Sequence, residues 1–568
     1  MNCILYFFYL VLLCLCWTPL SPAHESLPDE IKDFSSCLMC HEGIEKLDEN
    51  HAFSCDQCHI LPENRHKPLA NHDLIVRFPA APSHAKIFCG SCHQNEISRL
   101  YNSLHYTLAG IINQTRYLWG AQKDPDPQYS ASGYGDLKGL PPDPSVVQTP
   151  ADLVDDLLRR RCITCHPGKK PPQERGLYRG LGCAACHILY ENDGVYRGRD
   201  QAMKGRKGYP KVHKFCNPIP VRQCLHCHNG PRVGADYTGL FEHDYHQSYR
   251  YPISRGMLPE RIYLMDHHRL KPDFHYEKGL LCVDCHEKGD VMGRGEVNRC
   301  QQEAVRIRCQ HCHEPYNNNI DESGKGQSHP CIEDGLFRSR QGRLHMLPIR
   351  DKSVKAHSIP QMKNVHCIGC HSAWSFSDYG PSLLRDDRRD LSQWAPWRLQ
   401  SNSTINDLFD EQGRFLGPVS GPGPWFLGWR FRRWEFLTLG KDSKGRIVPF
   451  RPRYQFLISF IDKNGRVILD SVIPQRGDGS GQGWAYMPFY PHTVQKRGRP
   501  CEACHGQPLA AGQGIWKGQG QDLLLTRPSP PVYPSLKLLS ESEKTKLLQK
   551  TPIYRKWRFR TLWQDFND

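Results

Sequence analysis

Beyond its first residues, the sequence lacks any long hydrophobic run and is poor in apolar residues. Only 39% of its 568 residues are hydrophobic, the mean hydropathy is −0.61, and 47 glycines and 44 prolines interrupt regular structure. No segment after residue 17 is apolar enough to span a bilayer, because a spanning helix needs about 20 such residues. The chain has too few apolar residues to form large hydrophobic cores, so a protein of this length would need other groups to fill its interior.

Cysteine and histidine, in contrast, are abundant and regularly spaced. The chain has 26 cysteines and 29 histidines, and ten copies of Cys-x-x-Cys-His, numbered here from first to tenth in chain order. Each copy is the signature for covalent attachment of a c-type haem, in which two thiols form thioethers and the histidine supplies one iron ligand. The predicted attachment cysteines are Cys37, Cys40, Cys55, Cys58, Cys89, Cys92, Cys162, Cys165, Cys183, Cys186, Cys224, Cys227, Cys282, Cys285, Cys309, Cys312, Cys367, Cys370, Cys501 and Cys504. The predicted proximal iron ligands are His41, His59, His93, His166, His187, His228, His286, His313, His371 and His505.

A zinc ribbon, a thioredoxin-like redox pair and chance are the alternatives to ten covalent haems. Random placement of this many cysteines and histidines would give far fewer than one such motif. A zinc ribbon pairs its Cys-x-x-Cys units but does not require histidine at the fifth position. Because every unit here carries that histidine, the pattern favours haem c and iron as the cofactors.

The N-terminus predicts export. Residues 4–17 form an apolar run of 14, which matches the core of a signal peptide and is too short for a membrane span. Small residues at Ser21 and Ala23 predict cleavage after residue 23. The expected location is the periplasm or the cell surface, although Met1-Asn2 carries no lysine or arginine.

The formal net charge of +15 raises the possibility of a nucleic-acid or membrane partner. Each haem would add propionate carboxylates, so much of the lysine and arginine excess is expected to neutralise them. No nucleic-acid partner is therefore expected.

The spacing of the motifs predicts an uneven organisation. The expected fold is a mostly irregular and α-helical chain wrapped around a haem array, with a β-rich haem-free module near the C-terminus. The expected segments are a signal peptide (1–23), a trihaem segment (24–119), a linker (120–150), a hexahaem segment (151–371), the β-rich module (372–497), and a terminal haem with a basic-aromatic tail (498–568).

Local signals support three elements outside the motifs. Thr149 followed by Pro150 predicts a helix start, with an apolar stripe at Leu153, Val154, Leu157 and Leu158. Asn464-Gly465 between β-rich runs predicts a hairpin over 454–471, and residues 442–445 predict a second turn. Ser540 and Glu543 form a capping box for a short helix. The module is expected to be either a packing wall for the haems or a docking surface.

The second axial ligand decides whether a haem passes electrons or binds substrate, because a haem ligated on both faces is saturated. Histidines outside the motifs are numerous enough to supply ten such ligands, and methionine is a less favoured alternative. Seven are selected because they lie upstream of a motif or, for His105, apart from any motif: His51, His84, His105, His275, His357, His366 and His492. His66, His72, His213, His243, His246, His267, His268, His329 and His345 complete the pool.

The sequence around Phe274-His275-Tyr276-Glu277-Lys278-Gly279-Leu280-Leu281 before Cys282, and Pro491-His492-Thr493 before Cys501, resembles large multihaem c-type cytochromes. Anaerobic bacteria use these proteins to respire metals or sulfur compounds. The resemblance implies that His275 is a distal ligand. The chain has no Cys-x-x-Cys-Lys motif, the variant that marks the active haem of ammonia-forming nitrite reductases.

Cys216, Cys300 and Cys331 lie outside the motifs in the mature chain. A Cys300–Cys331 disulfide and three unpaired cysteines are both open alternatives. Residues 555–560 mix cations with aromatics and are expected either to pack on the protein or to dock an acidic partner or membrane surface.

The sequence therefore favours a non-enzymatic decahaem electron carrier over an enzyme. This carrier has mostly bis-histidine haems and links other redox proteins in anaerobic respiration. The expected partners are cytochromes, a quinol-oxidising membrane complex or a terminal reductase. Two alternatives stay open: a terminal reductase of an inorganic oxyanion or metal with one open haem, and a cytochrome subunit of a larger membrane or filament complex.

Overall fold

The computed structural model describes residues 37–549, except 68–71, 134–135, 230–233, 244–259, 315–330, 334, 352, 375–381, 401–402, 429–437, 454–455, 506 and 513–527. All ten motifs fall within the described residues. The predicted signal peptide, the basic-aromatic tail, His246 and His329 lie outside them. Among the described residues, no helix is long and apolar enough to cross a membrane.

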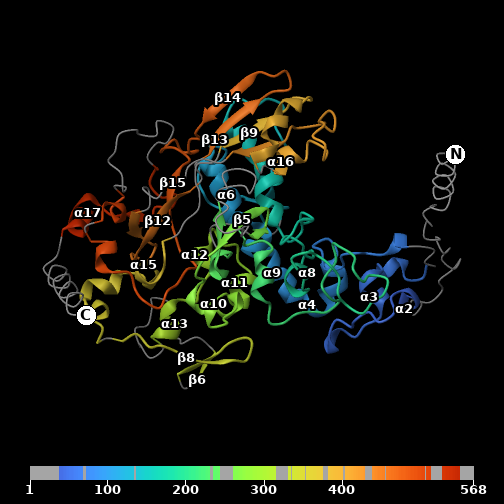
Figure 1. Cartoon of the computed structure of the whole chain (residues 1–568), viewed down its shortest axis with the longest axis horizontal. Helices are drawn as coiled ribbons and strands as arrows, with labels where there is room; N and C mark the ends of the chain where they lie inside the picture. The colour runs from blue at the N-terminus through green and yellow to red at the C-terminus, as the bar shows by residue number, and fades with distance from the viewer. Residues whose placement is uncertain are drawn as a thin grey trace, which may run out of the picture.

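Much of the described chain is irregular, and most of its helices are single turns. The helices are α2 (Cys37–Cys40), α3 (Cys55–His59), α4 (Ala85–Asn102), α5 (Leu104–Thr107), α6 (Ala109–Leu118), α7 (Pro150–Leu157), α8 (Ala184–His187), α9 (Val221–Leu225), α10 (Phe274–Glu277), α11 (Lys288–Val291), α12 (Gln301–Ala304), α13 (Cys309–His313), α14 (Lys355–Ser358), α15 (Cys367–His371), α16 (Ser403–Asn406) and α17 (Glu541–Leu548). The motif-bearing helices follow one another along the long axis of the molecule, from α2 and α3 at one end to α15 near the other (Figure 1).

Two four-stranded sheets lie above this row and make the C-terminal region β-rich (Figure 1). One sheet has the order β10-β9-β13-β14, formed by β9 (Ser382–Asp386), β10 (Trp425–Gly428), β13 (Leu457–Ile461) and β14 (Val467–Val472). The other has the order β15-β12-β11-β16, formed by β11 (Thr438–Lys441), β12 (Ile447–Arg453), β15 (Ala485–Pro488) and β16 (Lys537–Leu538).

Smaller sheets occur earlier in the chain. They are β1 (Tyr129–Ser130) with β2 (Lys138–Gly139); β3 (Leu240–His243), β4 (Glu260–Ile262) and β5 (Met265–Arg269); and β6 (Ile332–Glu333), β7 (Leu336–Arg338) and β8 (Leu344–Met346).

Both turns predicted in the β-rich region are confirmed. Strands β13 and β14 pair antiparallel across the Asp462–Gly465 turn, where the Gly465 amide donates to the Asp462 carbonyl at 2.9 Å. Strands β11 and β12 pair across Asp442–Gly445 with the same 2.9 Å bond. Gly445 and Gly465 have φ of +74° and +82°, the left-handed conformation that glycine adopts at no steric cost.

The two predicted helix starts are also confirmed. At α7 the Asp152 carboxylate accepts from the backbone amide and the hydroxyl of Thr149, both at 2.8 Å. At α17 the Ser540 hydroxyl accepts from the Glu543 amide and the Glu543 carboxylate accepts from the Ser540 amide. These side chains satisfy amide groups that the first helical turn leaves without partners.

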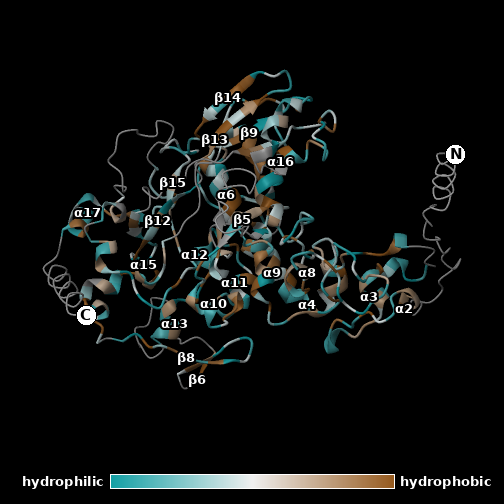
Figure 2. Ribbon diagram, viewed as in Figure 1, coloured by the Kyte–Doolittle hydropathy of each residue, from teal (hydrophilic) through white to brown (hydrophobic). Residues whose placement is uncertain are grey.

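The main core joins segments that are far apart in the sequence. Its buried side chains come from α6, α7, both large sheets and the segment around Tyr533. Figure 2 shows brown, hydrophobic stretches along the sheets and α6. All four apolar positions predicted for α7 are at most 2% exposed. The core therefore packs the β-rich sheets directly on α6 and α7.

A buried polar network strengthens this junction. Arg385 on β9 forms ion pairs with Asp143 at 3.0 Å, Asp156 at 3.4 Å and Asp387 at 2.8 Å. The Trp425 indole also donates to Asp156, at 2.7 Å. Because each buried charge has several partners, the network offsets the cost of desolvating it.

The predicted linker over 120–150 is irregular apart from β1 and β2, and one side chain pins it to α6. The side-chain Nδ2 of Asn113 donates to the Tyr129 carbonyl at 2.8 Å. Its Oδ1 accepts from the backbone amides of Gln128 and Tyr129, both at 3.0 Å. This segment is held against the core by its backbone.

Candidate haem-binding site

Most motifs form one short turn, and the third lies within the longer helix α4. In the fifth, sixth and tenth motifs, the amides of His187, His228 and His505 donate to the carbonyl of the first cysteine at 2.7–2.9 Å. Residues separated by three or four positions share one face of such a turn. Both thiols and the imidazole can therefore meet one edge and one face of a single porphyrin.

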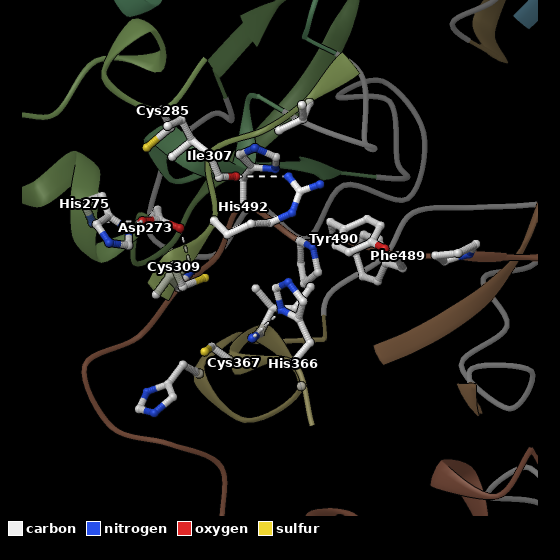
Figure 3. Close-up of a pocket in the computed structure, with 18 of the residues that line it drawn as sticks. Asp273, His275, Cys285, Ile307, Cys309, His366, Cys367, Phe489, Tyr490 and His492 are labelled. Carbon is white, nitrogen blue, oxygen red and sulfur yellow. Dashed lines mark hydrogen bonds and ion pairs between the residues drawn. The ribbon is translucent and has the colours of Figure 1, made fainter. Parts of the chain in front are cut away.

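A continuous cavity of about 3620 Å³ runs past seven of these turns. Its lining includes cysteines of the fourth to tenth motifs and is mostly apolar around them. Figure 3 shows part of this space, with Cys285, Cys309 and Cys367 beside His275, His366 and His492. A typical ligand pocket is about 300–1,000 Å³, so this cavity is several times larger than one small molecule needs. Protein interiors are normally close-packed, and a space of this size lined with thiols and imidazoles fits several large cofactors.

Seven motif histidines each face a second histidine from elsewhere in the chain. The ring centroids lie 5.8–6.3 Å apart in the pairs His41–His72, His51–His93, His59–His213, His105–His228, His275–His313, His286–His492 and His357–His371. Imidazole nitrogens bind a metal at about 2 Å, and the ring centroid lies about 1 Å further back, so two rings on one metal ion would be roughly 6 Å apart. The separation in all seven pairs matches that geometry.

Hydrogen bonds at Nδ1 fix the orientation of most of these rings. In ten of the fourteen, the Nδ1 atom lies 2.6–3.4 Å from a carboxylate or carbonyl oxygen: His41, His51, His59, His105, His213, His275, His286, His313, His357 and His371. An Nδ1–H that donates to such an oxygen leaves the lone pair on Nε2, which is the form that binds a metal. Metal-ligating histidines are usually held in this way.

Burial keeps several of these histidines neutral. Desolvation lowers the pKa of His228 and of His492 to about 4, and it also lowers the pKa of His59 and His105. A ligand histidine must be unprotonated at the binding nitrogen. At neutral pH these side chains are in the required state.

The structure brings five of the seven selected distal histidines to a motif histidine: His51, His105, His275, His357 and His492. His72 and His213, which the sequence places only in the wider pool, have the same geometry. The remaining two selected residues lie elsewhere. His366 caps α15 by accepting from the Ile368 amide at 3.3 Å, and its ring packs on Tyr490. His84 lies at the start of α4, with Nδ1 3.4 Å from the Phe78 carbonyl.

The position of a histidine just upstream of a motif does not identify the motif histidine it faces. His51 precedes the second motif but faces His93 of the third, and His492 precedes the tenth but faces His286 of the seventh. His275 precedes the seventh motif and faces His313 of the eighth. His357, in contrast, precedes the ninth motif and faces His371 of that same motif.

The sequence analysis did not identify the residues that hydrogen-bond to the candidate ligand histidines. Asp48, Asp273 and Asp290 lie two to four residues from the histidines that they hold, a local signal that could have been found. Asp200 holds His41 from 159 residues away, and nothing local indicates it.

The other three motif histidines have different surroundings. The Nε2 atom of His166 lies 2.9 Å from the Tyr106 carbonyl, and its Nδ1 accepts from the Gly168 amide at 3.0 Å. The Nδ1 atom of His505 lies 3.0 Å from the Leu547 carbonyl. Burial lowers the pKa of His187.

The cysteines outside the motifs take separate positions. Cys300 is a free thiol at the edge of the main core, so the Cys300–Cys331 disulfide is not formed. Cys216 donates from its thiol to the Cys186 carbonyl at 3.5 Å, beside the fifth motif.

Comparison of the chain with protein-family models, curated proteins and solved structures finds no match. The candidate site is therefore assigned from its own residues and geometry.

Proposed function

We propose that this protein is an exported decahaem c-type cytochrome that passes single electrons between redox partners in anaerobic respiration. The observation that carries the proposal is the set of seven histidine pairs, each joining a motif histidine to a second imidazole at about 6 Å. When bound, each haem would supply one-electron Fe(III)/Fe(II) exchange.

The chain's own residues prepare these sites in three ways. The cysteines of each motif would hold a porphyrin by thioether bonds, and the paired histidines would supply its iron ligands. The Nδ1 hydrogen bonds hold ten of the fourteen rings in one orientation, so little rearrangement would accompany a change of charge there. The apolar lining of the cavity would limit the access of water, which tunes the reduction potential.

The proposal predicts about ten covalently attached haems per chain, with a mostly low-spin, six-coordinate spectrum. Haem quantitation and electron paramagnetic resonance on the purified protein test both points. His105→Ala removes one ring of the His105–His228 pair and should convert one haem to a high-spin form. His66→Ala, at an exposed histidine, is the matched control and should leave the spectrum unchanged.

A high-spin signal already present in the unmodified protein, equivalent to about one haem per chain, would replace the pure carrier with the second candidate, a terminal reductase. One observation favours that candidate at the fourth motif. There, both ring nitrogens of His166 lie within hydrogen-bonding distance of backbone atoms, and the ring borders a second cavity of about 540 Å³ with His84 and Lys169. Such a haem would have a different axial ligation from the seven pairs and room for a small inorganic substrate.

A cytochrome subunit of a larger membrane or filament complex is the remaining alternative. Recovery of the protein in a stable complex would favour it, and exchange of electrons with soluble cytochromes or a quinol-oxidising complex would favour the free carrier.

A further inference from the structure

Asp273 lies beside two of the seven histidine pairs. It is 1% exposed and lines the cavity of about 3620 Å³. In Figure 3 it is drawn between His275 and His492. His275 faces the motif histidine of the eighth motif, and His492 faces that of the seventh. A buried carboxylate is costly unless hydrogen-bond donors surround it, so the donors to Asp273 show what this side chain holds in place.

The first carboxylate oxygen of Asp273, Oδ1, contacts His275 twice. It accepts from the backbone amide of His275 at 2.8 Å, which caps the start of α10, and it lies 3.0 Å from Nδ1 of the same residue. When Nδ1–H donates to this oxygen, the lone pair of the ring is on Nε2, the nitrogen left to bind a metal. Asp273 therefore fixes both the backbone position of His275 and the orientation of its ring.

The second carboxylate oxygen, Oδ2, holds the segment that carries His492. It accepts from the backbone amide of Val494 at 2.5 Å, and the Phe274 amide donates to the Val494 carbonyl at 2.9 Å. Nδ1 of His492 is buried and has no hydrogen-bond partner among the described residues, so no acceptor at that atom orients the ring. The position of His492 therefore depends on the backbone that carries it, two residues from the bond to Asp273.

The far side of this segment is bonded to the ninth motif. The Gln495 amide donates to the His371 carbonyl at 2.7 Å, and the Thr493 hydroxyl donates to the Ala373 carbonyl at 2.7 Å. Because several bonds hold the segment, loss of the bond to Val494 should disturb His492 less than loss of the Nδ1 bond disturbs His275.

Asp290 offers a comparison, because its carboxylate contacts a ring of one pair. One of its oxygens lies 2.6 Å from Nδ1 of His286, the motif histidine of the seventh motif. Asp273 differs in that its two oxygens reach two segments, each of which carries a candidate ligand for a different iron.

We propose that Asp273 is a positioning residue shared by the seventh and eighth haem sites, and that its charge lowers the reduction potential of the eighth. This inference rests on the proposed function and concerns how two of its sites are built. A negative charge hydrogen-bonded to a ligand imidazole stabilises Fe(III) more than Fe(II), because the ferric site carries one more positive charge. The electron transfer itself makes and breaks no bond.

Binding of carbon monoxide to the reduced protein tests the shared role, because it requires an iron whose axial imidazole can leave. Loss of a residue that orients a ligand weakens metal binding by about 10- to 100-fold. Asp273→Ala should therefore let carbon monoxide bind two more haems per chain than in the unmodified protein, faster at the eighth site than at the seventh. Asp290→Ala, the matched control, should add only the seventh. Carbon monoxide at one additional haem or none in Asp273→Ala would overturn the shared role.

Two further variants identify the sites. His275→Ala removes the second imidazole of the eighth site, and His492→Ala removes that of the seventh. The low-spin signal that each variant loses in electron paramagnetic resonance assigns that signal to its site.

Asp273→Asn separates the effect of charge from that of position. Asparagine is also a favoured N-cap and keeps an oxygen for the amide and Nδ1–H of His275, but it presents an NH₂ group to the Val494 amide. The eighth haem should stay low-spin and titrate at a higher potential, while the seventh should still become accessible to carbon monoxide. An unchanged potential at the eighth site would overturn the effect of charge, and a closed seventh site would overturn the shared role even if Asp273→Ala does not fold.

The unmodified protein distinguishes this inference from the function on which it rests. Recovery of far fewer than ten haems, or of mostly high-spin haems, would overturn the proposed function. Ten mostly low-spin haems, together with Asp273 variants that behave like the unmodified protein, would overturn the role of Asp273 alone.

Discussion

The row of motif turns and the β-rich C-terminal region are stabilised by different kinds of contact. In the β-rich region, side chains such as Phe450, Ile458 and Trp484 are fully buried in cores made of protein alone. In the row, short turns surround a cavity of about 3620 Å³ and many apolar or thiol side chains face that space. The side chains of the β-rich region therefore stabilise it by packing on one another. The row of motif turns would depend more on the cofactors that fill its cavity.

The largest effect is expected when haem attachment is prevented, because the two regions should then differ in stability. A chain expressed without the haem-attachment machinery should lose hydrogen-exchange protection in α13, because no residue of this turn is buried and its cysteines line the cavity. Strands β12 and β13 should keep slow exchange, since their side chains are buried by α6 and α7. Equal protection of the row with and without haem would contradict the comparison.

Phe450→Ala should destabilise the β-rich region by about 3–5 kcal/mol, because it empties a fully buried position on β12. Chemical unfolding followed by tryptophan fluorescence measures the loss, and the haem spectrum should change little in the folded protein. Val467→Ala, at a position on β14 that is 61% exposed, is the control and should cost much less.

Asp236 lies near Arg451 of the β-rich region, and its ionisation should make the stability of the protein depend on pH. Burial raises the pKa of Asp236 to about 7, against an opposing effect of Arg451 on β12, and its Oδ1 atom is buried without a hydrogen-bond partner. The folded pKa exceeds the unfolded value of about 4, so this group's stabilising contribution is complete below pH 4 and is lost as pH rises to 7.

Asp236→Asn should therefore raise the free energy of unfolding at pH 8 by on the order of 1–3 kcal/mol, with a smaller gain at pH 5. Thermal unfolding at the two pH values measures the difference, with exposed Asp136→Asn as the control. A gain that is equal at both pH values would show that the charge is not the cause.

The smallest expected effect lies at the start of α7, which connects the β-rich core to the fourth motif. Asp152→Ala removes the carboxylate that accepts from Gln148 and Thr149, and should cost about 1 kcal/mol. Denaturant unfolding measures the change. Thr149→Ser keeps the hydroxyl and should be nearly neutral, so an equal loss in both variants would argue against the cap.

Features that depend on residues close in the sequence were predicted, whereas features that depend on distant residues were not. The turns at Gly445 and Gly465 and the helix starts at Thr149 and Ser540 depend on residues within a few positions, and all four are found. The partners of the motif histidines depend on contacts such as His59 with His213 and His286 with His492. The sequence did not assign a motif to His51, His275 or His492, because chain folding, not separation along the sequence, brings these rings to their partners.

By itself, the sequence determined the ten turns that can each hold two thiols and an imidazole, and it predicted the cofactor and the export that follow from them. The tertiary structure decided which histidine faces each of seven motif histidines, which oxygen orients most of those rings, and that the main core joins α6 and α7 to the β-rich sheets. It also placed the fourth motif beside the fifth and the sixth. A motif is local because one helical turn builds it, whereas its partners are set by which distant segments pack around the same space.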